Sequence, residues 1–290
     1  MISGFVNFYK PSGMTSSDAV AIVRGTLSRA LGEKVKAGHM GTLDPFATGV
    51  LPIGVGKAAR LFDILLKKQK TYIAVIKFGT ATDTLDLTGK VLSEGGVVPS
   101  REDLERVLPE FTGELMQIPP AYSAKSVGGR RAYDLARKGQ DVELAPVKVT
   151  VHSIRLLSFS DDEATVEICS GSGTYIRALA RDIAARLGTT AHLTALERTA
   201  SGAFTADGAV TREGFESDPA AHILPIDFPL ADMPAVSLGE TDALTASRGG
   251  RVILSHELPG GDLAVRAVDG KFIGIGCAED GALRMKAVLC

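Results

Sequence analysis

The stretch GHMGTLDPFATG, residues 38–49, contains a single acidic residue, Asp44, set among glycines and a proline. Packing in a helix or strand does not explain an aspartate at this position, because glycine and proline interrupt both kinds of element. Two interpretations stay open from these residues alone. Asp44 is either a solvated residue of a tight turn, or the residue that the loop serves to hold in place.

The segments around this loop predict strands and amphipathic helices. Residues 4–10 predict a short strand, and Thr15 with Asp18 forms a capping box that opens a helix. A second amphipathic helix is expected over 57–66. Residues 71–80 predict a strand. Its alternate residues share one face: Tyr72, Ala74, Ile76 and Phe78. The other predictions before residue 117 are a turn with a return strand over 83–91 and a helix over 100–110.

The second half of the chain predicts an excursion, a strand pair, a helix and a small β domain. Residues 117–146 hold prolines, a glycine pair and several basic and aromatic side chains, a pattern typical of a functional excursion or of disorder. Residues 147–157 and 164–170 predict paired strands. A glycine-rich turn then enters a helix that ends at Gly188. Because short apolar segments alternate with Gly and Asp turns after about residue 235, we expect two domains, 1–235 and 236–290.

Composition limits the class of protein. The 290 residues are 45% hydrophobic and 23% charged, which is typical of a soluble globular protein. The three cysteines are scattered and odd in number, which argues against a disulfide framework and a structural zinc site. The first residues lack a signal-peptide pattern, and no apolar run reaches the roughly 18 residues of a membrane span. We therefore expect a cytoplasmic protein that does not contact membranes.

The charge is unevenly distributed along the chain. The net charge is −2, but residues 21–70 hold nine Lys and Arg against three Asp and Glu, whereas residues 201–290 hold seven against thirteen. A basic face that binds phosphates and a set of solvated lysines on helices both agree with this pattern.

Several segments look like known sequence motifs, but their residues do not have the spacing that those motifs require. GVGK (54–57) is not a phosphate-binding loop, because Leu51 and Ala58 stand where Gly and Ser or Thr are needed. SGSGTY (170–175) lacks the third glycine of a dinucleotide fingerprint. The five histidines include no close pair, so metal catalysis has little support, and we expect neither metal nor cofactor.

What remains is Asp44 with isolated cations and aromatic residues, among them His39, Tyr72 and Arg177. Arg177 lies in the first turn of its helix, where a cation opposes the helix dipole, so we expect it to have an acidic partner.

Five segments, in order, resemble the motifs of the tRNA pseudouridine synthase B (TruB) family. They are KPSGMTSSDAV (10–20), GHMGTLDPFATGVLPIGVGKAARL (38–61), QKTYIAVIKFGTATDTLDLTG (69–89), PPAYSAKSVGGRRAYDLARKG (119–139) and CSGSGTYIRALARDI (169–183). The resemblance covers nearly the whole chain, and the second motif is highly specific. It implies an enzyme that isomerises uridine 55 in the T loop of tRNA to pseudouridine without metal or cofactor.

The resemblance also implies roles for individual residues. Asp44 matches the catalytic aspartate, Tyr72 the tyrosine that stacks on the target base, and Arg177 the arginine paired with the aspartate. His39 matches the histidine that helps to flip the base, and Leu196 an active-site leucine. The expected RNA contacts are Lys10, Lys57, Arg60, Lys70, Lys125, Arg130 and Arg131. Residues 117–146 match an insertion that clamps the T arm, residues 236–290 resemble a PUA-like RNA-binding domain, and the protein is expected to be a monomer.

Two positions depart from the family pattern. Ser17 stands where histidine is usual, and Glu197 stands where arginine is usual, which puts one possible backbone contact in doubt.

The fold and function expected at this point are specific enough to test. We expect an α+β fold with a mixed, largely antiparallel sheet flanked by helices, with Asp44 on a loop in a central cleft. A non-catalytic RNA-binding protein on the same scaffold is the main alternative to an enzyme, and it would not need Asp44, Tyr72 and Arg177 together. A nucleotide hydrolase has less support, because the chain offers no triad and no base–metal pair.

Overall fold

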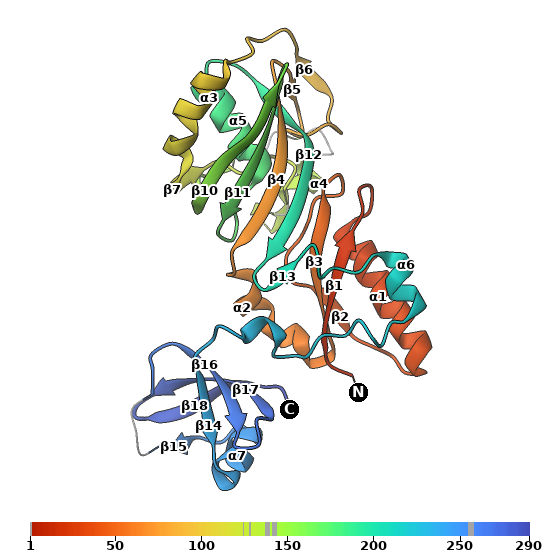
Figure 1. Ribbon diagram of the computed structural model, residues 1–290, viewed down its shortest axis with the longest axis vertical. Helices are drawn as coiled ribbons and strands as arrows, with labels where there is room; N and C mark the ends of the chain where they lie inside the picture. The colour runs from red at the N-terminus through yellow and green to blue at the C-terminus, as the bar shows by residue number, and fades with distance from the viewer. Residues whose placement is uncertain (1, 124, 128, 137–139, 141–143, 255–257) are drawn as a thin grey trace.

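A computed structural model describes residues 2–123, 125–127, 129–136, 140, 144–254 and 258–290 (Figure 1). Among the described residues, nine strands form the larger sheet, and the expected α+β class is confirmed. Its main path is β1 (Gly4–Lys10), β3 (Thr48–Val55), β12 (Ala191–Ser201), β4 (Lys70–Phe78), β11 (Glu163–Ser170), β10 (Val147–Ser160) and β7 (Gly113–Gln117). Two short strands, β2 (Ala37–His39) and β13 (Phe204–Thr205), pair with β3 and β12.

Helices cover this sheet through apolar faces, as the sequence predicts. The capping box of Thr15 and Asp18 is present at the start of α1 (Ser16–Leu31), which packs against β1, β2 and β3. Helix α5 (Ile176–Arg186) packs against β12 and β4. Every second residue of β4 is buried, including the predicted face. The main core therefore lies between the sheet and these two helices.

Strands β3 and β12 pair in parallel inside an otherwise mainly antiparallel sheet, and this pairing positions the Asp44 loop. Gly49 lies opposite Arg198, with φ +104, and a Cβ on Gly49 would lie 2.3 Å from the Arg198 carbonyl oxygen. Only glycine fits such a conformation and such a close approach. The loop that precedes β3 is therefore held beside β12.

The shorter elements differ in places from the sequence predictions. The expected helix over 57–66 is a 3₁₀ turn, Gly56–Leu61, followed by α2 (Phe62–Leu66). The expected return strand over 83–91 is mostly a turn, flanked by β5 (Ala81–Thr82) and β6 (Val91–Ser93). A turn forms here in place of the expected strand because side chains within it bond one another, as described below. The helix over 100–110 is α3 (Arg101–Val107) with a 3₁₀ turn, Leu108–Phe111.

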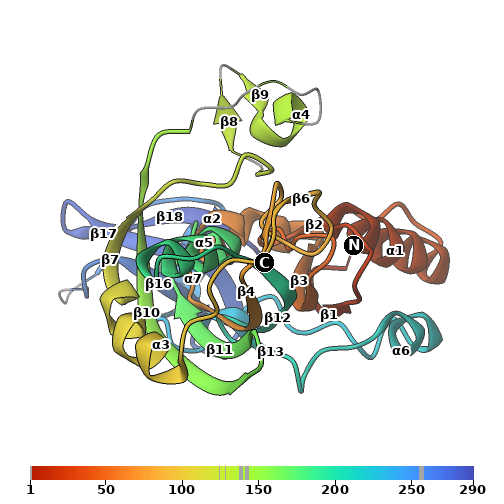
Figure 2. The ribbon, with the colours of Figure 1, turned by 90° about the horizontal axis from the view of Figure 1, so that it is seen from above.

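The excursion after β7 stands apart from the main sheet (Figure 2). Its described elements are β8 (Ser126–Val127), β9 (Arg130–Arg131) and α4 (Ala132–Ala136). We call residues 117–146 the arm, and residues 117–123 its root. In Figure 2 a long connection, the root, leads from β7 away from the sheet.

The last part of the chain forms a second sheet. Its strand order is β14 (Ala235–Leu238), β16 (Asp262–Ala267), β17 (Phe272–Glu279), β18 (Ala282–Val288) and β15 (Val252–Ile253). Strand β14 and helix α7 (Glu240–Ser247) are additions to the predicted β segments. The connection from β13 passes through α6 (Arg212–Ser217) and a 3₁₀ turn, Phe228–Leu230.

The second sheet is joined to the first by a shared apolar cluster. Phe272, Ile275 and Leu289 pack in one buried group with Phe5 and Leu61. An ion pair between Arg266 and Asp227, 2.7 Å long, lies at the same junction. Within the described residues, no helix has the length and apolar character needed to cross a membrane.

Candidate active site

Asp44 lies in the loop between β2 and β3, with about a third (34%) of its side chain exposed. The segment that leads into α1, together with the first residue of the helix, holds this loop. Ser16 Oγ accepts from the Leu43 N–H and donates to the Leu43 carbonyl, both at 2.9 Å. The Gly13 N–H donates to the Pro45 carbonyl at 2.8 Å. The peptides on both sides of Asp44 are therefore fixed by residues 10–16.

Lys10 also bonds this loop, and the prediction that Lys10 contacts RNA is wrong. The side chain is fully buried, and Nζ donates to the carbonyls of Pro11, Met14 and Pro45 at 2.9, 2.8 and 3.2 Å. Burial lowers the pKa of Lys10 to about 8, although the charge of Asp44 acts in the opposite direction. A buried ammonium that is already bonded to carbonyl groups has no access to a phosphate.

Arg198 holds the other end of the loop, a role that sequence reasoning missed. The side chain is 1% exposed; Nε donates to the Val50 carbonyl at 2.7 Å, and Nη1 and Nη2 donate to the Thr42 and Gly41 carbonyls at 3.2 and 3.3 Å. The adjacent Glu197 instead accepts a 2.8 Å bond from the Tyr9 hydroxyl. The departure at Glu197 therefore leaves the loop contacts intact.

Arg177 pairs with Asp44, which gives the arginine the acidic partner that its position predicts. Nε lies 2.9 Å from Asp44 Oδ2, and the guanidinium is 5% exposed. Nη1 donates to the Thr84 carbonyl at 2.8 Å, and Nη2 to the Tyr122 carbonyl at 3.0 Å. A guanidinium held on three sides keeps Asp44 in one orientation.

Asp86 is a second carboxylate on the same guanidinium, and sequence reasoning missed it too. Its Oδ2 lies 3.4 Å from Arg177 Nη1, and the side chain is 5% exposed. Its Oδ1 accepts from the Thr84 hydroxyl at 2.7 Å, and from the Thr88 hydroxyl and N–H at 2.5 and 2.9 Å. The signal in the sequence was the run DTLDLTG, where hydroxyl residues flank an acid at the spacing of an Asx turn.

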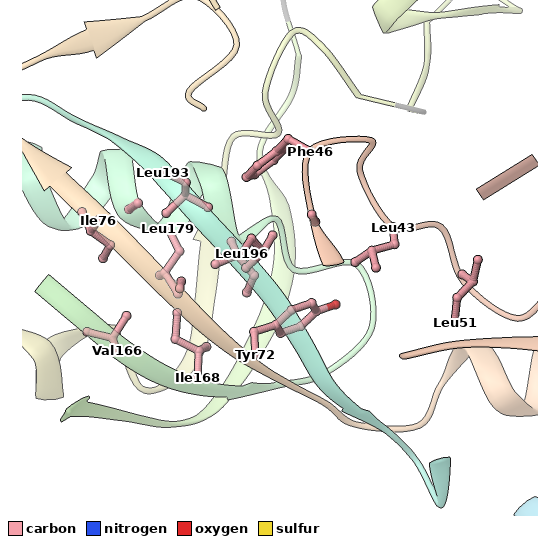
Figure 3. Packing of buried hydrophobic residues seen from close by; sticks show 14 of the residues in the cluster. Leu43, Phe46, Leu51, Tyr72, Ile76, Val166, Ile168, Leu179, Leu193 and Leu196 are labelled. Atoms are coloured by element: carbon pink, nitrogen blue, oxygen red, sulfur yellow. The ribbon is translucent and has the colours of Figure 1, made fainter. Parts of the chain in front are cut away.

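Leu43, the residue before Asp44, shares one buried apolar cluster with Tyr72 and Leu196 (Figure 3). Tyr72 on β4 and Leu196 on β12 are both mostly buried, and in Figure 3 the Tyr72 hydroxyl points toward the side of Leu43. Tyr175 precedes α5 and was not predicted as a site residue. Burial is the main cause that raises the pKa of the Tyr175 phenol, and the charge of Asp44 raises it further. The ion pair therefore lies near the Tyr175 ring.

His39 lies at the end of β2, five residues before Asp44. It lines a hollow of about 410 Å³ together with Ser17, Val20, Ala21, Arg24 and Gly38. Ser17, which departs from the family pattern, therefore lines the same hollow as His39.

The remaining predicted RNA contacts fall into three groups. Lys70 is 6% exposed, and its Nζ donates to the carbonyls of Leu66 and Lys68, so its predicted contact is wrong for the same reason as that of Lys10. Lys57 and Arg60 are exposed but bond the Cys290 and Val288 carbonyls of the last strand segment. Lys125 is exposed in the arm, whereas Arg130 and Arg131 form β9 and their side chains lie outside the described structure.

This arrangement suits a carboxylate that attacks a substrate or removes a proton. A buried guanidinium 2.9 Å from Asp44 fixes the direction of the carboxylate, and a carboxylate held in this way can act as nucleophile or base. Within the described parts of the chain, no three His, Cys, Asp or Glu residues gather into a group that could hold a metal ion.

Comparison with known proteins identifies the chemistry. Residues 28–176 match the model of the TruB family pseudouridylate synthase, N-terminal domain. The chain belongs to this family. The enzyme is 42% identical over 294 residues to tRNA pseudouridine synthase B of Azoarcus sp. strain BH72, a match that covers 100% of this chain and 95% of the relative. It is 40% identical over 284 residues to tRNA pseudouridine synthase B of Aquifex aeolicus, with 97% of both chains covered. It is therefore an isomerase that converts uridine in RNA to pseudouridine.

The fold is also found in solved structures. A chain in the structure of an H/ACA RNP bound to a substrate RNA containing 2′-deoxyuridine matches with a TM-score of 0.74 at 23% identity, covering 99% of this chain and 85% of the other. A Cbf5–Nop10–Gar1 complex matches with the same TM-score at 25% identity, over 98% and 84% of the two chains. Both matches extend over the two sheets of the enzyme.

Proposed function

We propose that this enzyme isomerises uridine 55 in the T loop of tRNA, with Asp44 as its catalytic residue. The tRNA substrate is supported by full-length similarity to relatives named tRNA pseudouridine synthase B. The observation that carries the role of Asp44 is the 2.9 Å contact of its partly exposed carboxylate with the buried Arg177. A family member that only bound RNA would not need a buried cation to hold this carboxylate.

The reaction breaks the bond between N1 of uracil and C1′, rotates the base, and joins it to C1′ through C5, while C5 loses its proton and N1 gains one. A base cannot rotate inside a stack, so the nucleotide must leave it, at a cost of a few kcal/mol. In this proposal His39 helps to displace the base, and Tyr72 stacks on it, which returns about 1–3 kcal/mol. Asp44 then acts as nucleophile at C1′ or C6, or as base at C2′, while Leu196 completes the apolar wall. No cofactor takes part.

The arm and the second sheet supply the grip on tRNA. The arm, with Lys125, Arg130 and Arg131, clamps the T arm of the tRNA. The second sheet acts as a PUA-like RNA-binding domain. The two domains are residues 1–235 and 236–290. Because residues 201–290 carry an acidic surplus, we expect the second domain to contribute weak contacts. The enzyme acts as a monomer in the cytoplasm.

Tritium release tests this proposal. A T-arm hairpin carrying 5-³H-uridine at the target position is incubated with wild-type enzyme and with Asp44→Asn. Release by the wild type alone supports both the target and the role of Asp44. Tight binding without release by the wild type favours the non-catalytic RNA-binding protein, and equal release by both enzymes removes Asp44 from the mechanism.

A further inference from the structure

Helix α5, which carries Arg177, starts without the residue type that usually starts a helix. Its N-cap position is occupied by Tyr175, and the preceding residues are the glycine-rich turn 170–174. Ser, Thr, Asp or Asn at this position would bond the first free N–H groups and fix the direction of the first turn. The direction of α5 therefore depends on a contact from outside the helix.

Gln117 provides that contact from 58 residues away. The Tyr175 N–H donates to Gln117 Oε1 at 2.9 Å, and Gln117 Nε2 donates to the Tyr175 carbonyl at 3.2 Å. The Gln117 side chain is 2% exposed. A planar carboxamide that bonds both polar groups of one residue fixes its backbone in orientation as well as in position.

The first two turns of α5 bond the root of the arm at two further points. Arg177 Nη2 donates to the Tyr122 carbonyl at 3.0 Å, and Arg181 Nη2 donates to the Ile118 carbonyl at 2.9 Å. Gln117 is the last residue of β7 and the first residue of the root. The root, the first two turns of α5 and the Arg177–Asp44 pair therefore form one bonded unit, and Gln117 joins that unit to the sheet.

We propose that Gln117 is a positioning residue for pseudouridine formation. It acts through the Tyr175 backbone, which sets the first turn of α5 and so the place from which Arg177 holds Asp44. This inference rests on the proposed role of Asp44. If Gln117 only stabilised the helix, its loss would lower the melting temperature and leave the rate on bound RNA unchanged.

The test separates the rate on bound RNA from binding and from stability. Gln117→Met keeps the length and apolar volume of the side chain but removes both hydrogen bonds. We measure the single-turnover rate at saturating T-arm hairpin, the hairpin Kd and the melting temperature, all rates being taken well below the melting temperature. We expect the rate to fall about tenfold or more, because small displacements of reacting groups are costly, with the Kd within about threefold of wild type.

The matched control is Ser100→Ala, which removes the side-chain cap of α3 at an exposed position. It should lower the melting temperature and keep the wild-type rate. A Gln117→Met rate within about threefold of wild type, an effect on Kd alone, or an equal rate loss in Ser100→Ala overturns the proposal. If Gln117→Met does not fold, Gln117→Glu, which keeps an oxygen toward the Tyr175 N–H, is judged by the same criterion. Tritium release by the wild type tests the proposed function by itself. The role of Gln117 is tested separately, by the ratio of the single-turnover rate of the variant to that of the wild type.

Discussion

Ser16 binds the backbone of Leu43 on both of its polar groups, with the serine hydroxyl 2.9 Å from the leucine nitrogen and 2.9 Å from its carbonyl oxygen. The residue after Leu43 is Asp44, so a side chain at the start of α1 sets the position of the carboxylate that we propose to be catalytic. The motif around residues 10–16 is thus explained by its contacts with the loop.

Ser16→Ala should weaken both stability and catalysis. Removal of the hydroxyl leaves a buried N–H and a buried carbonyl of Leu43 without this partner, which costs about 1–3 kcal/mol of unfolding free energy. Urea denaturation and the single-turnover rate measure the two effects. Ser12→Ala is the control, because exposed Ser12 donates one bond to the same loop, to the Phe46 carbonyl. A rate loss as large in Ser12→Ala as in Ser16→Ala would contradict this explanation.

Asp86→Asn should slow the reaction on bound RNA while the hairpin Kd stays near the wild-type value. The amide removes a negative charge 3.4 Å from Arg177, so the guanidinium loses one of its two anionic partners and its hold on Asp44 loosens. Loss of one partner of a buried ion pair costs about 3–5 kcal/mol when the pair is tight, and less at this longer distance. Asp83→Asn in the same turn is the control, because Asp83 bonds the Lys90 N–H. Equal rates for Asp86→Asn and wild type would rule out this role.

The buried Lys10 should make the unfolding free energy of the enzyme depend on pH. Burial lowers its pKa from 10.5 to about 8, so between these values the unfolded chain holds a proton that the folded protein does not. Its contribution therefore makes the protein more stable as the pH rises from 8 to 10.5, by at most about 3 kcal/mol. Denaturation of wild type and Lys10→Met at several pH values isolates this contribution. The difference in unfolding free energy, wild type minus variant, should increase over this range, and a constant difference would contradict the assigned pKa.

Gly49→Ala should destabilise the enzyme strongly. The new Cβ would lie 2.3 Å from the Arg198 carbonyl oxygen, and φ is +104. Strain and displacement of β12 together cost about 3 kcal/mol or more. Gly38→Ala is the matched control, because its Cβ meets nothing within 4 Å. Differential scanning calorimetry compares the two, and melting temperatures lowered equally would argue against the close approach of β3 and β12.

The sequence predicted elements whose signals are local. The capping box at Thr15, the alternation around Tyr72 and the helix after Tyr175 each depend on neighbouring residues, and each is present. The partnership of Arg177 with Asp44 was also expected, from the helix dipole and from the family resemblance. Local signals are reliable here because each one satisfies its own hydrogen bonds or buries its own face.

The missed residues act over long separations. Gln117, Asp86 and Arg198 bond groups that lie tens of residues away or more, and nothing in their own neighbourhood reveals the partner. Lys10 and Lys70 were misread for a related reason. A basic residue next to a turn or loop can face a phosphate or a set of backbone carbonyls, and only the packing decides between them.

The bonds from Arg198 to the Gly41 and Thr42 carbonyls also order the assembly of the enzyme in time. The two partners are more than 150 residues apart in the chain, so the loop that carries Asp44 cannot take its final shape until β12 has been synthesised. At about 5–20 residues per second on the ribosome, that delay is of the order of ten seconds or more. The pair of strands β1 and β3 therefore lacks its neighbour β12 until then, and the ability to modify RNA cannot appear before Arg198 has been added to the chain.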